Sequence, residues 1–240
     1  MAGRGFAGDT SPISNNRIFA TRNGIFRPMY VPVNPDRPFS GICLAESFAD
    51  LYQKDAGCDV GLIPCADGGT SLDQWKSGSV LFDNACYSAE LASRSSEIKG
   101  ILWHQGESDC DESLYPTYAE RLSIMIDALR KKLGMGDIPF IMGGLGDFLA
   151  DCTLSDKFKN YAHVNEALRL VANDKINCGF ASARGLGSNP DRLHFNAPAL
   201  REFGARYYEE YKRIVAKSHF VRASRDRTTE AIKSTAIELL

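Results

Sequence analysis

Residues 98–109 read IKGILWHQGESD, and their apolar half changes abruptly into a polar half. The apolar run is typical of a buried β-strand, and His104, Gln105 and Glu107 follow it without a spacer. Because polar side chains at the end of a buried strand cost free energy unless they have partners or a use, this cluster indicates a functional site. A simpler interpretation is that Gln105 and Glu107 only cap the next segment. The stretch therefore predicts a strand that delivers imidazole, amide and carboxylate groups to one edge of a sheet.

On both sides of this stretch, apolar runs alternate with segments of helical periodicity. We expect strands within residues 58–65, 98–106, 137–146 and 176–185, and helices within residues 43–54, 84–96, 118–134, 158–174 and 197–216. Such alternation predicts an α/β fold in which helices cover both faces of a parallel sheet. We expect one domain over residues 1–216, followed by a polar tail or a loosely docked helix over residues 217–240.

The composition is that of an ordinary globular protein, with 240 residues, 44% hydrophobic residues and 24% charged residues. A net charge of −2 gives no reason to expect nucleic acid or a membrane surface as a partner. The seven cysteines are scattered without a C-x-x-C pair, which favours free thiols in a reducing compartment and no zinc site. These features favour the cytoplasm for the chain as it stands, although an export signal could precede Met1.

A second polar stretch follows the strand expected at residues 58–65, where the sequence IPCADGGTS places Gly68 beside Gly69. Two adjacent glycines let backbone N–H groups approach a ligand closely, as in an anion-binding nest. A tight turn before a helix is an equally good interpretation of this stretch when it is taken alone. Because the carboxyl ends of parallel strands share one edge of a sheet, we expect it to lie near His104.

A third polar stretch, SNPDRLHFN, precedes the last expected helix and places Asp191 three residues before His194. On one turn of chain, this spacing lets the carboxylate accept a hydrogen bond from one imidazole nitrogen. The other nitrogen is then free to act as a base. This arrangement is the orienting half of a Ser-His-Asp triad, whose logic depends on geometry and not on residue order.

The stretches IPCADGGTS, WHQGESD and PDRLHFN, in this order and at these distances, resemble one family. They look like the sialate O-acetylesterase and plant-type acetylxylan esterase branch of the SGNH hydrolases. The resemblance covers most of residues 1–216. It implies a three-layer α/β/α sandwich with a flavodoxin-like sheet. It also implies hydrolysis of acetyl esters on carbohydrates or small ester substrates, with no metal or cofactor.

The resemblance also implies roles for six residues. His194 would be the general base, and either Asp191 or Glu107 would be the carboxylate of the triad. The side-chain amide of Gln105 would donate to the oxyanion. A backbone N–H of the glycine pair, from Gly69 more than from Gly68, would add a second donor.

The family's nucleophilic serine lies in a stretch of the type GQSNMAGRG, and only its second half, MAGRG, is present as residues 1–5. We therefore expect the serine and the first strand to lie upstream of Met1. Ser14, Ser40 and Ser71 do not follow a strand in a way that would expose an activated hydroxyl. We also expect this chain to be less stable than one extended upstream.

Two functional hypotheses remain open on this evidence. In the first, the chain is part of an acetylesterase whose serine lies upstream. In the second, it is an inactive relative that binds acylated carbohydrate without cleaving it. A flavodoxin-like nucleotide binder is disfavoured, because the sequence contains no phosphate-loop or dinucleotide glycine pattern.

Overall fold

The structure is a computed structural model that describes the backbone of residues 2–237 and the side chains of residues 2–218. Met1, and the end of the expected tail at residues 238–240, lie outside the described residues. The helices are α1 (Leu44–Ala56), α2 (Val80–Ala92), α3 (Tyr118–Leu133), α4 (Tyr161–Asp174) and α5 (Ala197–Ile237). The strands are β1 (Ile18–Arg22), β2 (Ile25–Pro28), β3 (Val60–Leu62), β4 (Ile101–Trp103), β5 (Phe140–Gly143) and β6 (Cys178–Ala181).

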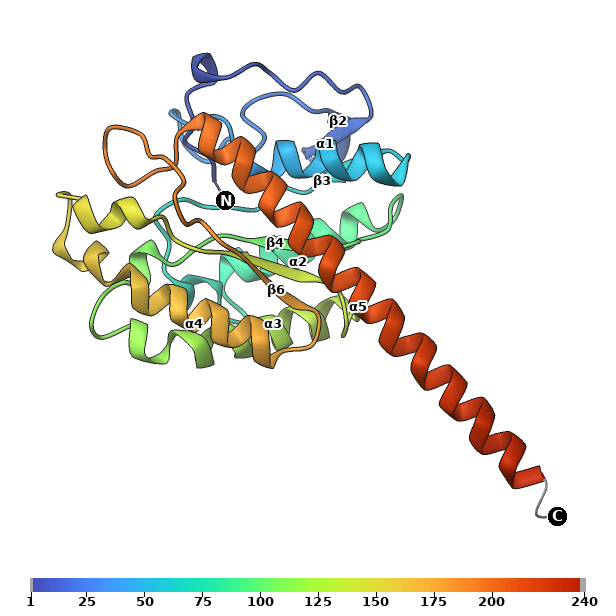
Figure 1. Cartoon of the computed structure of the whole chain (residues 1–240). Coiled ribbons are helices and arrows are strands. Elements are labelled where there is room, and N and C mark those ends of the chain that lie inside the picture. The colour runs from blue at the N-terminus through green and yellow to red at the C-terminus, as the bar shows by residue number, and fades with distance from the viewer. Residues whose placement is uncertain (1, 238–240) are drawn as a thin grey trace.

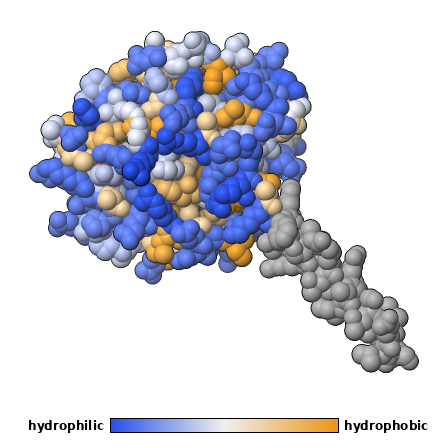
Figure 2. Space-filling model, in the orientation of Figure 1, coloured by the Kyte–Doolittle hydropathy of each residue, from blue (hydrophilic) through white to orange (hydrophobic). Residues whose placement is uncertain are grey.

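The predicted α/β class is confirmed, and the helices form two layers around the strands (Figure 1). Helices α1 and α5 pack together on one face, while α2, α3 and α4 pack along the other. The core lies between these layers, and every residue of β5 is buried. The face of the body that Figure 2 shows is mostly hydrophilic, with small separate hydrophobic groups. No helix in the described residues is long and apolar enough to cross a membrane.

The expected elements agree with the observed ones except at their boundaries. The helix expected at residues 84–96 begins earlier, at Val80, because Ser79 is the last extended residue before it. Helix α3 ends where Gly134 adopts a left-handed conformation, as its glycine stop predicts. Helix α5 continues without a break across residue 216 and projects beyond the body (Figure 1).

The strands form two three-stranded sheets rather than one continuous sheet. The first has the order β2-β1-β3 and the second the order β4-β5-β6. All pairings are parallel except that of β1 with β2, which is antiparallel. Within residues 2–237, no strand pairing joins β3 to β4. The edge strand of each sheet, β3 in the first and β4 in the second, therefore borders a gap between the sheets.

The antiparallel pair β1–β2 was not expected. Its strands are joined by Asn23 and Gly24, which both have positive φ angles, 52° and 76°. These angles are those of a type I′ turn, and Asn-Gly is the residue pair that this turn favours. The dipeptide between two apolar runs was thus a signal in the sequence for a hairpin.

Strands β3 and β4 run in the same direction. The segments that follow their carboxyl ends lie together, and so do the segments that precede their amino ends. Beyond the carboxyl ends, Nε2 of Gln105 donates to the carbonyl oxygen of Thr70 at 3.0 Å. Before the amino ends, Cys58 and Lys99 line the same cavity. A cavity of about 1040 Å³ occupies the gap and is lined by residues from both strands.

Candidate active site

The structure brings the six predicted site residues to one end of this gap. Five of them line the cavity, namely Gly68, Gly69, Gln105, Glu107 and His194. The sixth, Asp191, is hydrogen bonded to His194. The loops that carry them follow β3, follow β4 and precede α5. The three polar stretches therefore meet at one end of the gap.

His194 and Asp191 form a pair, in which Nδ1 of the imidazole lies 2.7 Å from Oδ2 of the carboxylate. The other carboxylate oxygen accepts the backbone N–H groups of Leu193 and His194 at 2.9 and 3.0 Å. These bonds hold the carboxylate in a turn in which Arg192 has a positive φ of 53°. Because Nδ1 is engaged, Nε2 is the nitrogen that remains for proton transfer. Among the described residues, no hydroxyl group is hydrogen bonded to this ring.

The same hydrogen bonds set the charge of Asp191. Partial burial alone would raise the pKa of its carboxyl group, but the bonds from the His194 ring and from two backbone N–H groups lower that pKa. Asp191 is therefore ionised at neutral pH. An ionised carboxylate on Nδ1 favours the tautomer in which this nitrogen carries the proton.

Glu107 has a different partner. Its Oε1 lies 3.5 Å from Nε2 of His104, and no hydrogen bond joins it to His194 within the described residues. Burial alone would raise the pKa of Glu107, but the interaction with His104 lowers it to about 2. Burial lowers the pKa of His104 below its ordinary 6.5. The rings of Phe195 and Phe203 pack edge-on against this imidazole.

Gln105 is buried, and both hydrogens of its amide are engaged. Nε2 donates to the carbonyl oxygen of Thr70 at 3.0 Å and to Oδ2 of Asp109 at 2.7 Å. Its Oε1 accepts the hydroxyl of Tyr118 at 3.0 Å. An amide has only two N–H donors, so Gln105 in this arrangement holds the loop after β3 against the loop after β4. Its role as an oxyanion donor stays a prediction, and would require one of these bonds to open.

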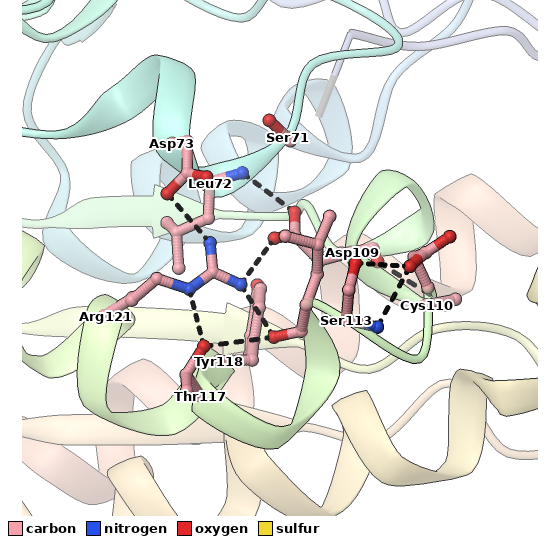
Figure 3. A network of polar contacts seen from close by, with 12 residues as sticks. Ser71, Leu72, Asp73, Asp109, Cys110, Ser113, Thr117, Tyr118 and Arg121 are labelled. Atoms are coloured by element: carbon pink, nitrogen blue, oxygen red, sulfur yellow. Dashed lines mark hydrogen bonds and ion pairs between the residues drawn. The ribbon is translucent and has the colours of Figure 1, made fainter.

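Asp109 is the site residue that the sequence reasoning missed, and it is fully buried. Its Oδ2 accepts the backbone N–H of Leu72 at 2.8 Å as well as the amide of Gln105. Its Oδ1 accepts Nη2 of Arg121 at 2.9 Å, and Arg121 also contacts Asp73 at 3.1 Å (Figure 3). Asp109 therefore joins both loops to α3. Its place at the end of WHQGESD was the available signal.

The two glycines of the loop after β3 are not equivalent. The N–H of Gly68 donates to Oδ2 of Asp36 at 2.9 Å, and Arg4 fixes that carboxylate at 2.7 Å. Burial alone would raise the pKa of Asp36, but the bonds from Arg4 and Gly68 lower it to about 2. The N–H of Gly69 has no acceptor among the described residues. Gly69 also has a φ of +82°, a conformation that favours glycine. Because its N–H has no acceptor there, this group is available to a ligand, whereas the N–H of Gly68 is not.

All seven cysteines are free, and five of them are buried. Within the described part of the chain, no three side chains of His, Cys, Asp or Glu stand close enough to hold a metal ion. The geometry displays an oriented imidazole and an exposed backbone N–H that line the same cavity.

Comparison with known proteins assigns the chain to a family of esterases. The chain belongs to the family described as carbohydrate esterase, sialic acid-specific acetylesterase, whose sequence model matches residues 1–213. One relative is a probable carbohydrate esterase of Arabidopsis thaliana, which is 28% identical over 179 residues. That match covers 71% of this chain and 62% of the relative, so the aligned part spans less than two thirds of the Arabidopsis protein.

The solved structures show the same fold. The X-ray structure of that Arabidopsis protein has a TM-score of 0.79 at 25% identity, covering 88% of this chain and 92% of the other. A carbohydrate acetylesterase from Xanthomonas citri gives 0.63 at 18% identity, covering 84% of this chain and 50% of the other. NanS gives 0.61 at 17% identity, covering 75% and 73%. The predicted family and its SGNH-type fold are confirmed.

Proposed function

We propose that this chain carries the base, the orienting carboxylate and an oxyanion donor of an esterase that removes O-acetyl groups from carbohydrates. The observation that carries the proposal is the His194–Asp191 pair at 2.7 Å, which opens on the same cavity as the N–H of Gly69. Membership of the acetylesterase family supports the acetyl ester as the substrate class. In this proposal, the nucleophile is a serine hydroxyl, which none of the described residues presents to the His194 ring.

The chemistry follows the acyl-enzyme route. The serine Oγ attacks the carbonyl carbon of the acetyl group while its proton passes to Nε2 of His194. The N–H of Gly69 donates to the carbonyl oxygen as negative charge develops there, and one such donor is worth about 10²–10³ in rate. The imidazolium then protonates the sugar oxygen, which leaves as an alcohol. Water, deprotonated by the same nitrogen, attacks the carbonyl carbon of the acetyl-enzyme. The bond from that carbon to the serine Oγ then breaks, Oγ takes the proton back from the imidazolium, and acetic acid leaves and ionises to acetate.

The remaining site residues support this geometry. Asp191 holds the imidazole and stabilises its charged form, so it is the triad carboxylate in this proposal. Gln105 keeps the loop of Gly69 in place through the carbonyl of Thr70, and it becomes a second oxyanion donor only if its bond to that carbonyl opens. Glu107 acts on the site through His104. The proposal thus separates groups that handle protons from groups that position them.

A second candidate is an inactive relative that binds acylated carbohydrate. The observation that favours it is the absence, among the described residues, of a hydroxyl hydrogen bonded to the His194 ring. In this case the cavity and the Gly69 N–H would bind an ester carbonyl without attacking it.

Acetate release separates the two candidates. The substrates are 4-nitrophenyl acetate, an O-acetylated sialic acid and an acetylated xylo-oligosaccharide. The 240-residue chain is compared with the same chain preceded by an apolar strand ending in Gly-Gln-Ser-Asn, and His194→Ala in the extended chain is the control. Activity in the extended chain that His194→Ala removes supports the esterase. Binding of the acetylated sugars by both chains, with hydrolysis by neither, supports the binding relative.

A further inference from the structure

Phe39 lines the cavity and belongs to the loop that precedes α1. We propose that Phe39 is a specificity-determining residue, whose ring stacks against the pyranose ring of the acetylated sugar. That the ligand is an acetylated sugar rests on the proposed function. The stacking contact itself is measured by binding, whether or not the ester is cleaved.

Exposure distinguishes Phe39 from the other aromatic residues of the cavity. Phe39 is 67% exposed, whereas every other aromatic residue among the described residues that line the cavity is buried or half-buried. Trp75, which follows the glycine loop, is buried and packs edge-on against Trp103. Exposure alone would assign no function to Phe39, because single apolar side chains are common on protein surfaces. The ring of Phe39 is also held in a fixed position.

Arg4 holds the Phe39 ring on one face. The guanidinium carbon of Arg4 lies over the ring, 5.0 Å from its centroid, which is the geometry of a cation–π contact. Arg4 is itself fixed, because its Nη1 and Nη2 donate to the two oxygens of Asp36 at 3.0 and 2.7 Å. Only 9% of the Arg4 side chain is exposed. The exposed area of Phe39 therefore includes the face of the ring opposite Arg4.

The backbone that carries Phe39 is fixed as well. The N–H of Ser40 donates to the carbonyl oxygen of Arg37 at 3.0 Å, which closes a turn around Phe39. The hydroxyl of Ser40 donates to Oδ1 of Asp36 at 2.8 Å and accepts the N–H of Arg37 at 3.0 Å. Pro38 has a restricted φ within this turn. A side chain that is already ordered loses little conformational entropy when a ligand binds to it.

The same contacts join Phe39 to the loop of Gly69. Oδ2 of Asp36, which binds Arg4, also accepts the N–H of Gly68 at 2.9 Å. A Cβ atom added to Gly68 would lie 3.4 Å from the guanidinium carbon of Arg4. Arg4 thus contacts the Phe39 ring on one side and the glycine loop on the other. Since the proposed mechanism binds the acetyl carbonyl at the N–H of Gly69, the sugar attached to that acetyl group lies next to Phe39 in this proposal.

Another pair of contacts joins this arrangement to the base. The Nδ2 of Asn189 donates to the carbonyl oxygen of Arg4 at 2.9 Å. The N–H of Asn189 donates to the carbonyl oxygen of His194 at 2.7 Å. Phe39, the loop of Gly69 and the loop of His194 are therefore held by one connected set of contacts around Arg4.

The chemistry of this part of the cavity fits an uncharged sugar ring. The C–H groups on the face of a pyranose are apolar and slightly positive, and the face of a phenyl ring is slightly negative. Arg4 is paired with Asp36 at 2.7 Å. Arg37 is paired with Asp67 at the same distance, so neither arginine offers an unpaired charge to a carboxylate. The surroundings of Phe39 therefore favour a neutral pyranose over an anionic sugar.

The first test is binding of an acetylated sugar to the 240-residue chain. The ligand is methyl 3-O-acetyl-β-D-xylopyranoside, whose ring substituents are all equatorial, and an NMR titration measures the Kd. Phe39→Ala should raise this Kd about 3–10-fold, which is the size expected for the loss of one aromatic contact. Phe39→Tyr keeps the ring and should restore the binding. For an O-acetylated sialic acid, the rise caused by Phe39→Ala should be smaller.

Phe6→Ala is the matched control. Phe6 is also an exposed phenylalanine, at 55%, but it does not line the cavity, so its replacement should leave the Kd unchanged. An unchanged Kd in Phe39→Ala, or an equal rise in Phe6→Ala, would overturn the stacking contact. Absence of xyloside binding, or a larger effect of Phe39→Ala on the sialic acid than on the xyloside, would overturn it as well.

Hydrolysis separates the stacking contact from the proposed function. In the chain preceded by an apolar strand that ends in Gly-Gln-Ser-Asn, acetate release is compared for the xyloside and for ethyl acetate, which has no ring. Phe39→Ala should lower the ratio of kcat/KM for the xyloside to that for ethyl acetate about 3–10-fold, through KM more than through kcat. Binding that depends on Phe39, without hydrolysis of either ester, supports the contact and contradicts the esterase function. Hydrolysis of both esters, with the ratio and the Kd unchanged in Phe39→Ala, supports the esterase and overturns the contact.

Discussion

The molecule contains two histidine–carboxylate pairs, and their surroundings are opposite. The His104–Glu107 pair lies after β4 at a separation of 3.5 Å, and only 8% of the His104 side chain is exposed. The His194–Asp191 pair lies before α5 at 2.7 Å, and 38% of the His194 side chain is exposed. Both pairs have a spacing of three residues, so the spacing alone does not distinguish them.

The difference between the pairs teaches which imidazole can exchange protons. Burial disfavours the charged form of His104, and its ring is enclosed by Phe195 and Phe203. The His194 ring, by contrast, keeps Nε2 toward the cavity while Asp191 fixes Nδ1. Phe195 follows His194 in the chain and packs on His104, so the buried pair supports the exposed one. In the proposed function, the exposed pair handles protons and the buried pair supports it.

The largest expected effect is on activity at the exposed pair. The assay uses the chain preceded by an apolar strand that ends in Gly-Gln-Ser-Asn. In this protein, His194→Ala should lower kcat/KM for 4-nitrophenyl acetate by at least about 10³-fold, because the general base is lost. Its free energy of unfolding should change by less than about 1 kcal/mol, because the side chain is partly exposed. Urea denaturation measures the second quantity. Full activity in this variant would remove the distinction between the pairs.

The next effect decides between the two carboxylates. Asp191→Asn should lower kcat/KM about 10²–10⁴-fold, because an amide no longer favours the productive tautomer of the imidazole. Glu107→Gln, assayed in the same way, should lower it by less than about tenfold. The reverse ranking would assign the triad carboxylate to Glu107.

A third effect is on stability at the buried pair. His104→Ala should lower the free energy of unfolding by about 2–4 kcal/mol, because it opens a void beside two phenylalanines and leaves Glu107 without its imidazole partner. Urea denaturation of this variant and of His194→Ala gives a matched comparison. Similar losses in the two variants would show that the buried pair has no special structural role.

The smallest effect depends on pH. The pKa of Glu107 is lowered from 4.5 to about 2, so its contribution to stability is fully present above pH 4.5 and is lost as the pH falls toward 2. Since 31% of this side chain is exposed, we expect a contribution of about 1–2 kcal/mol. In Glu107→Gln this part of the acid transition should disappear. Denaturation midpoints measured between pH 2 and pH 6 provide the comparison, and identical profiles for both proteins would contradict it.

The parts of the fold that sequence could predict are those encoded in local patterns. The strand ending at Trp103 and the helix ending at Gly134 are each marked by neighbouring residues, and both were predicted. The hairpin at Asn23 and Gly24 has an equally local signal, the Asn-Gly pair between two apolar runs. These elements needed no knowledge of distant contacts.

The parts of the site that escaped prediction depend on contacts between distant segments. The amide of Gln105 is engaged by Thr70, which lies 35 residues away in sequence. The N–H of Gly68 is engaged by Asp36, at a separation of 32 residues. No local pattern reports such partners, so the sequence could place these groups at the site without showing which of them keep a free donor. The roles assigned to the six residues remain predictions.

Helix α5 has a consequence for how the site can fail. It begins directly after the loop of His194, and Tyr207 and Tyr211 donate to the carbonyls of Trp103 and Lys99 at 2.6 and 3.2 Å. The helix is thereby locked to β4 and to the segment that leads into it. A slip of one turn would move the helix by about 5.4 Å, more than any hydrogen bond can follow. The register of α5 and the position of the imidazole are therefore a single all-or-none property.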